Sequence, residues 1–221
     1  MEDRRVSLPK QQNYEKAYRL SYELAQEKVA GIEDIDQQCR NSGTEYLKTN
    51  SSQSVIIKYL GLPYEISFPN ADVTQVGSDT DVPIREQLLI LHYFVSADGT
   101  PLSNKPVTFQ ELPEGVVYSI TFAQRTITPL TRFFGQDPGK LLQIIDCVGG
   151  YKADFGDVAA TINAFPYVPI TIVFWQGDDE LAPQGNILFD STIINYVPTE
   201  DITVLCETIT WKLIRQLKES F

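Results

Sequence analysis

The stretch VAATINAFPYVPITIVFW, residues 158–175, decides the fold. Val158–Phe165 and Ile170–Trp175 are rich in β-branched and aromatic residues, and Pro166–Pro169 separates them, so the sequence predicts two strands joined by a turn. The second strand is apolar on both of its sides, which is typical of a strand in the middle of a sheet. We therefore expect a sheet with Ile170–Trp175 near its centre, followed by the acidic segment 176–180.

Outside this stretch, apolar residues recur mostly with helical spacing. The tyrosines at 14, 18 and 22 share one face with Ala25 and Val29, which predicts an amphipathic helix whose aromatic stripe packs in the core. From Ile84 to Val95, apolar residues cover nearly every direction, as in a buried central helix. The predicted helices are about 13–29, 32–40, 84–95, 138–148 and 199–218, a hairpin is predicted over 54–59 and 64–68, and 99–106 is expected to be a loop.

This order of elements predicts an α+β fold, with a small, mostly antiparallel sheet packed by helices. We find no internal repeat and no linker, so the sequence predicts a tail over 1–12 and a single domain over 13–221. The secondary structure of residues 116–134 stays undecided, because their apolar residues fit both a strand and a helix.

The composition excludes several classes of protein. The chain has 221 residues, one His and three Cys, so a multi-histidine zinc site and a four-thiolate iron–sulfur cluster are excluded. The first residues lack a signal-peptide core, and the longest apolar run is too short to span a bilayer. We therefore expect a cytoplasmic protein in which Cys39, Cys147 and Cys206 are reduced thiols.

The formal net charge of -11 is unevenly distributed. Residues 153–211 contain no Lys or Arg. A surface of this sign repels phosphate backbones and anionic lipids, so we expect neither a nucleic acid nor a membrane as partner. It suits cations or basic protein surfaces, and it also serves solubility. The nine acidic residues of the stretch are Asp154, Asp157, Asp178, Asp179, Glu180, Asp190, Glu200, Asp201 and Glu207.

The first candidate site is acidic. Asp178, Asp179 and Glu180 follow the predicted central strand, and Asp190 ends the next apolar segment. Carboxylates gathered at a strand end can ligate a hard cation, with Asp178, Glu180 and Asp190 as the metal ligands, or can act as an acid–base pair. The alternative is an acidic turn in which one buried Asp binds backbone amides.

The second candidate is His92 with Tyr93, in the most apolar helix. A histidine there can be the axial ligand of a haem or another large cofactor such as a corrinoid. The alternative is a neutral core histidine bonded to a backbone carbonyl. No standard catalytic or phosphate-binding motif accompanies either candidate, so whether the protein is an enzyme stays open, and its cofactors are unknown.

Several segments together resemble the bacterial and archaeal family called domain of unknown function 3786. The resemblance runs from about Tyr14 onward, and it adds Arg125 to the candidate site residues. One departure is Leu181-Ala182-Pro183, where an aromatic residue is expected after the acids. The matching segments are 88–93, 99–102, 109–113, Gly115, Phe122, Arg125, Pro129-Leu130, Phe134-Gly135, 165–169, 174–180, 186–190 and 198–201.

The family has no assigned function, so the resemblance implies a context more than a mechanism. Its members occur largely in anaerobes, and some similar proteins carry an N-terminal four-cysteine iron–sulfur domain of the kind found in corrinoid proteins. No four-cysteine cluster precedes Tyr14 here. The resemblance therefore implies a non-catalytic ligand- or partner-binding accessory domain of an anaerobic one-carbon metalloenzyme system, with an iron–sulfur or corrinoid protein as a separate partner.

Overall fold

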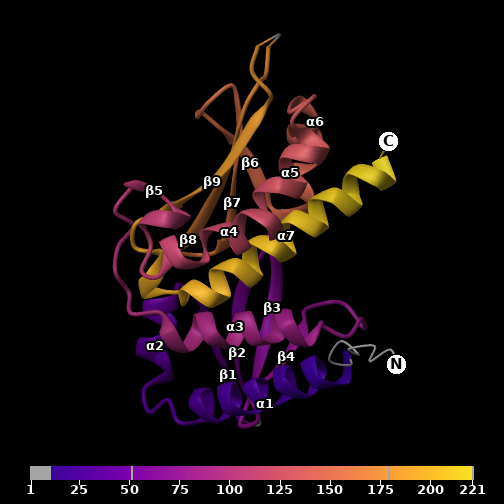
Figure 1. Ribbon diagram of the computed structural model, residues 1–221. Helices are drawn as coiled ribbons and strands as arrows, with labels where there is room; N and C mark the ends of the chain where they lie inside the picture. The colour runs from indigo at the N-terminus through magenta and orange to yellow at the C-terminus, as the bar shows by residue number, and fades with distance from the viewer. Residues whose placement is uncertain (1–10, 51, 179, 221) are drawn as a thin grey trace, which may run out of the picture.

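The computed structural model describes residues 11–50, 52–178 and 180–220. In it the chain forms an α+β fold in which helices pack on two antiparallel sheets (Figure 1). The predicted fold class is therefore confirmed, although the sequence led us to expect one sheet. No helix in the described part of the chain is both long and apolar enough to cross a membrane.

The first sheet is formed by consecutive strands in the order β1-β2-β3-β4. The central pair places Val55 opposite Ile66 and Ile57 opposite Tyr64, and all four side chains are buried. Helix α1 packs against α3, and α3 lies over the strands (Figure 1). The elements of this part are α1 (Gln11–Ala30), α2 (Ile35–Ser42), β1 (Glu45–Lys48), β2 (Gln53–Tyr59), β3 (Leu62–Phe68), β4 (Asp72–Gln75) and α3 (Ile84–Ser96).

The second sheet has the order β5-β9-β8-β7-β6, so β8 is central, as the sequence predicted. Its first two residues, Val168 and Pro169, belong to the strand and not to the turn. The elements are β5 (Pro106–Thr108), η1 (Phe109–Glu111), α4 (Gly115–Arg125), α5 (Ile127–Phe134), α6 (Gly139–Ile144), η2 (Ile145–Val148), β6 (Gly150–Ala153), β7 (Val158–Phe165), β8 (Val168–Trp175), β9 (Gln184–Asp190), η3 (Ile193–Asn195) and α7 (Thr199–Ser220).

The two sheets share one hydrophobic core. Phe165 at the end of β7 lies between Tyr59 of β2 and Tyr93 of α3, with ring centroids 5.0 and 4.2 Å away. Gly61 and Gly149 meet beside them with positive φ angles of 80° and 66°, and neither site has room for a Cβ atom. The backbones of the two halves therefore touch directly.

The undecided segment 116–134 is helical and forms α4 and α5. The alternation of Val116, Tyr118, Ile120 and Phe122 does not reflect a strand, because the first three are exposed on α4 and only Phe122 is buried. The sequence predicted that the tyrosine stripe of α1 packs in the core. Tyr18 and Tyr22 are partly buried and pack against the hydrophobic core. Of the tail predicted over 1–12, residues 1–10 lie outside the described residues, and residues 11 and 12 already belong to α1.

Candidate functional site

His92 is held by a carboxylate. Its Nδ1 lies 2.6 Å from Oδ2 of Asp201 in the first turn of α7, and 28% of its side chain is exposed. The expected backbone carbonyl partner is therefore wrong, because α7 crosses α3 at this position and brings an acid that is remote in sequence. Carboxylates orient metal-bound histidines in the same way, so a haem or corrinoid ligand at His92 stays a hypothesis.

Tyr93 serves the core. It is fully buried, stacks on Phe165 and donates a 2.7 Å hydrogen bond from its hydroxyl to the Ser42 carbonyl. Burial raises the pKa of this hydroxyl far above its usual range. Its hydrogen bond ties α3 to the end of α2, so we assign Tyr93 a structural role.

The acidic candidates lie at opposite ends of a hairpin. Strands β8 and β9 are antiparallel, with Trp175 paired to Gln184 and Ile170 paired to Phe189. Asp178 and Glu180 therefore belong to the connecting turn, whereas Asp190 is about 20 Å away, because six steps of strand rise separate it from Gln184 at the turn. Asp179 lies outside the described residues. Within the described ranges, no three His, Cys, Asp or Glu side chains are placed to hold one metal ion.

Asp178 and Asp190 each bind backbone amides. Oδ1 of Asp178 accepts hydrogen bonds from the Glu180 and Leu181 amides, both at 2.8 Å, and these lower its pKa. Asp190 is buried and accepts from the amides and hydroxyls of Ser103 and Thr192. Burial raises the pKa of Asp190, but these hydrogen bonds outweigh it and hold the pKa at about 2. Both residues thus fit the structural alternative.

The depressed pKa of Asp190 makes stability depend on pH. Its contribution is complete above the ordinary carboxyl pKa of 3.8 and is lost as the pH falls toward about 2. We expect Asp190→Asn to lower the free energy of unfolding by about 1.5 kcal/mol at pH 7 and by much less at pH 2. Urea unfolding measured at both pH values tests this. Asp79→Asn, at an exposed carboxylate, is the control, and an equal loss at both pH values for Asp190→Asn would refute the assignment.

Arg125 belongs to an ion-pair network that joins three helices. Its Nη2 donates to Oε2 of Glu207 on α7, and the same oxygen accepts from Nη2 of Arg85 on α3 at 2.7 Å. Burial raises the pKa of Glu207, but the hydrogen bonds from both arginines lower it further than burial raises it. One carboxylate between two guanidinium groups leaves a net positive charge at this point.

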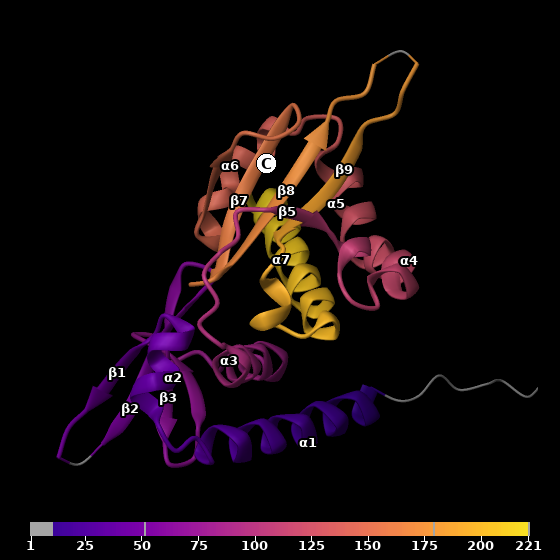
Figure 2. The same cartoon turned by 90° about the vertical axis from the view of Figure 1, so that its left-hand side faces the viewer.

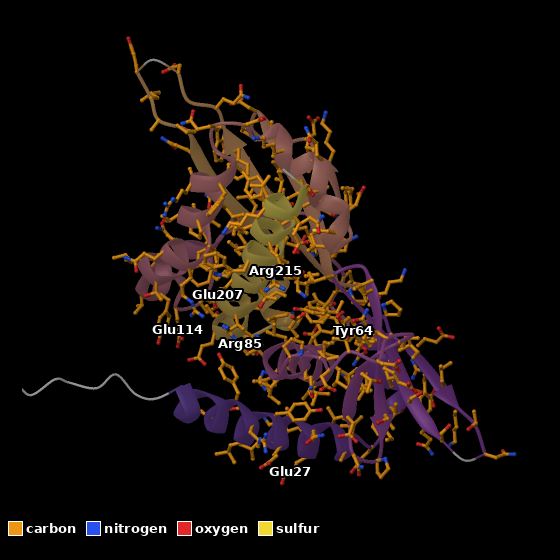
Figure 3. All side chains as sticks on the ribbon, turned by 90° about the vertical axis from the view of Figure 1, so that its right-hand side faces the viewer. Glu27, Tyr64, Arg85, Glu114, Glu207 and Arg215 are labelled. Atoms are coloured by element: carbon orange, nitrogen blue, oxygen red, sulfur yellow. The ribbon has the colours of Figure 1, made fainter. Side chains whose placement is uncertain are left out.

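This network borders a cleft of about 640 Å³ between α7 and the first half of the chain. Figure 3 shows Arg85, Glu207, Arg215 and Tyr64 around it. On α7, Lys212 forms a 3.1 Å ion pair with the buried Glu86 of α3. The lining residues are Tyr64, Gln75, Thr80, Asp81, Val82, Pro83, Arg85, Glu86, Glu207, Thr208, Trp211, Lys212 and Arg215.

Two lining side chains of α7 are open to solvent. The Trp211 ring is 49% exposed, which is unusual for an indole. Arg215, one turn further on, is exposed and has no carboxylate within 4 Å among the residues that the structure describes. An aromatic ring and this guanidinium group thus lie side by side on the cleft wall.

The family model of DUF3786, a domain of unknown function, matches residues 34–211. The chain belongs to the DUF3786 family. Neither a curated protein nor a solved structure matches it. The matched region begins after α1 and ends within α7. It includes Arg85, Arg125, Glu207 and Trp211. Lys212 and Arg215 lie just beyond its end.

Of the residues in the cleft and its bordering ion-pair network, the sequence placed only Arg125, a member of the network, among the candidates. The others were missed because they come from α3 and α7, which are distant in sequence. One signal was present: Lys212 and Arg215 are the first basic residues after the base-free stretch 153–211, and Trp211 immediately precedes them.

Proposed function

We propose that this domain is a non-catalytic binding module whose cleft takes a small anionic ligand with a flat aromatic group. The observation that carries the proposal is the exposed Trp211 ring beside Arg215, whose guanidinium group has no carboxylate within 4 Å among the described residues, on the wall of one cleft. A cleft of about 640 Å³ has the size of small-molecule sites, which lie between about 300 and 1,000 Å³.

The charged lining residues balance, with Arg85, Lys212 and Arg215 against Asp81, Glu86 and Glu207, and the bordering Arg125 adds one positive charge. Lys212 is balanced by Glu86, and Asp81 offsets the free Arg215. The remaining positive charge comes from Arg85 and Arg125, which share the single carboxylate of Glu207. Phosphate and carboxylate groups are bound well by such guanidinium groups, and Arg215 has its donors available.

Trp211 provides the surface for the flat part of the ligand. Its exposed ring lies within one helical turn of Arg215, so a ring stacked on the indole has its anionic group near the guanidinium. A phosphorylated or carboxylated heterocycle combines the two features.

The chemistry of the cleft supports binding over catalysis. Its two buried or half-buried carboxylates, Glu86 and Glu207, are each held by cations, and the lowered pKa of Glu207 makes it a weak general base. The lining residues include neither a histidine nor a cysteine.

The family resemblance supports the further proposal that the module serves an anaerobic corrinoid or iron–sulfur enzyme system. Cys39 and Cys206 are buried and Cys147 lies apart from both in the sequence, so a cluster would belong to a separate partner protein. Reduced thiols fit a cytoplasmic location, and the acidic charge fits a protein partner better than a nucleic acid.

Trp211 fluorescence tests the cleft, because Trp175 is the second of only two tryptophans. In a Trp175→Phe background, we expect adenosine diphosphate to quench the emission with a Kd below about 1 mM, and adenosine alone to bind at least tenfold more weakly. Arg215→Gln should weaken binding about tenfold. Arg132→Gln, at an exposed arginine outside the cleft, should have no effect. No quenching by adenosine diphosphate or pyrophosphate up to about 10 mM would refute the proposal.

A further inference from the structure

The outward face of the second sheet is lined by aromatic and small side chains. Register places Tyr151 beside Thr161 and Thr171, and the next row on this face contains Ala153, Ala159 and Val173. Trp175 lies two residues further along β8, and Phe155 follows the end of β6 in the loop that leads to β7. Strand alternation puts the strand side chains on one face, and Phe155 lies in the loop at its edge. We call Tyr151, Ala153, Phe155, Ala159 and Trp175 the aromatic face.

No described helix covers the aromatic face. Figure 2 shows α6 and α7 behind the strands of this sheet, and the large apolar side chains of the opposite face, such as Ile162 and Ile172, belong to the main core. Ala159 and Val173 are buried but stand outside that core, beneath the local layer of the aromatic face.

Three aromatic rings on this face are open to solvent. Tyr151, Phe155 and Trp175 are 52%, 43% and 41% exposed. Gly156 brings the loop against the Trp175 ring, since a Cβ on this glycine would lie 3.3 Å from Trp175 Cε2. Exposed rings gathered on one sheet face are typical of a docking surface.

The charge around the aromatic face is predominantly negative, since Lys152, between Tyr151 and Ala153, points to the opposite face of the strand by alternation. Asp154 and Asp157 flank Phe155 in sequence, and Oδ2 of Asp157 accepts a 2.8 Å hydrogen bond from the Gln176 amide directly after Trp175. Asp178 and Glu180 follow in the same turn, and no Lys or Arg occurs in residues 153–211. Among the described residues, Arg85 lies over the Tyr18 ring and Lys218 lies over the Phe133 ring, and both contacts are elsewhere in the molecule.

We propose that the aromatic face docks a cationic, arginine- or lysine-rich segment of a partner protein. The acids attract the segment, and its guanidinium or ammonium groups stack on Trp175 and Tyr151. Charge complementarity excludes a second copy as the favoured occupant, because symmetric pairing would bring two acidic rims together. The surface lies on the sheet face turned away from α7, so it is independent of the cleft.

A hexa-arginine peptide tests this surface in a Trp211→Phe background, where Trp175 is the sole indole. We expect saturable quenching that weakens as salt rises, and a loss of at least tenfold in affinity for Tyr151→Ala. The triple variant Asp154→Asn, Asp157→Asn, Glu180→Gln should lose at least as much. The control Glu23→Gln, Glu27→Gln, Glu219→Gln changes the net charge equally at exposed sites elsewhere and should bind as the parent.

Equal weakening in both triple variants would overturn the proposal, because it would mean attraction by net charge alone. A dimer detected by sedimentation and abolished by Trp175→Ala would overturn it as well, since the occupant would then be a second copy. Circular dichroism of each variant confirms that the fold is retained.

Discussion

Gly149→Ala is expected to destabilise the fold by about 3 kcal/mol. A Cβ at this position would lie 2.5 Å from the Gly61 Cα atom, and the backbone φ of 66° is already unfavourable for alanine. Backbone approaches of this kind cannot relax by a side-chain rotation, so the two halves of the molecule must separate locally. Urea unfolding followed by circular dichroism measures the loss.

Gly77→Ala is the matched control. Gly77 has a similar φ of 76°, but a Cβ added there would have nothing within 4 Å of it. It should therefore show only the conformational cost of about 1 kcal/mol. If Gly149→Ala and Gly77→Ala cost the same, the direct contact between the two halves is not a source of stability.

Glu207→Gln is expected to lower stability and raise anion affinity together. The substitution leaves Arg85 and Arg125 without their shared counter-charge, which should cost about 2 kcal/mol because both guanidinium groups are partly solvated. The same change adds one positive charge to the cleft, and adenosine diphosphate should bind about tenfold more tightly. Unfolding and fluorescence titrations of one preparation test both effects.

Glu200→Gln is the control for this prediction. Glu200 lies on the same helix and is exposed, and it is not part of the cleft lining. Its replacement should change neither quantity by more than about 0.5 kcal/mol. A stable Glu207→Gln variant with unchanged affinity would show that the arginine network neither holds α3 to α7 nor sets the charge of the cleft.

Local patterns were sufficient to predict the central hairpin and the long helices. Strand β8 was recognised because its residues are apolar on both sides, and six of its eight residues are buried. The segment 116–134 was ambiguous because Val116, Tyr118 and Ile120, all exposed, alternate with period two up to the buried Phe122 and so imitate a strand. The separation into two sheets was missed because it depends on which strands pair after folding, and no local pattern encodes that pairing.

The candidate site was harder to predict because its residues meet only after folding. Asp178 and Asp190 looked like neighbours in sequence, but an antiparallel hairpin places them at opposite ends. Conversely, Arg85 and Glu207 are 122 residues apart and meet because α7 packs across α3. The same crossing gave His92 a carboxylate partner in place of a backbone carbonyl.

The measurement that tests the binding cleft most directly is the indole N–H signal of Trp211 in a proton–nitrogen NMR spectrum. Only two indole signals are expected, and Trp175→Phe assigns them. We predict that adenosine diphosphate shifts the Trp211 signal in a saturable way and leaves the Trp175 signal in place, and that Arg215→Gln weakens the response. A Trp211 signal that stays unchanged at saturating adenosine diphosphate would contradict an anion-binding cleft at this position.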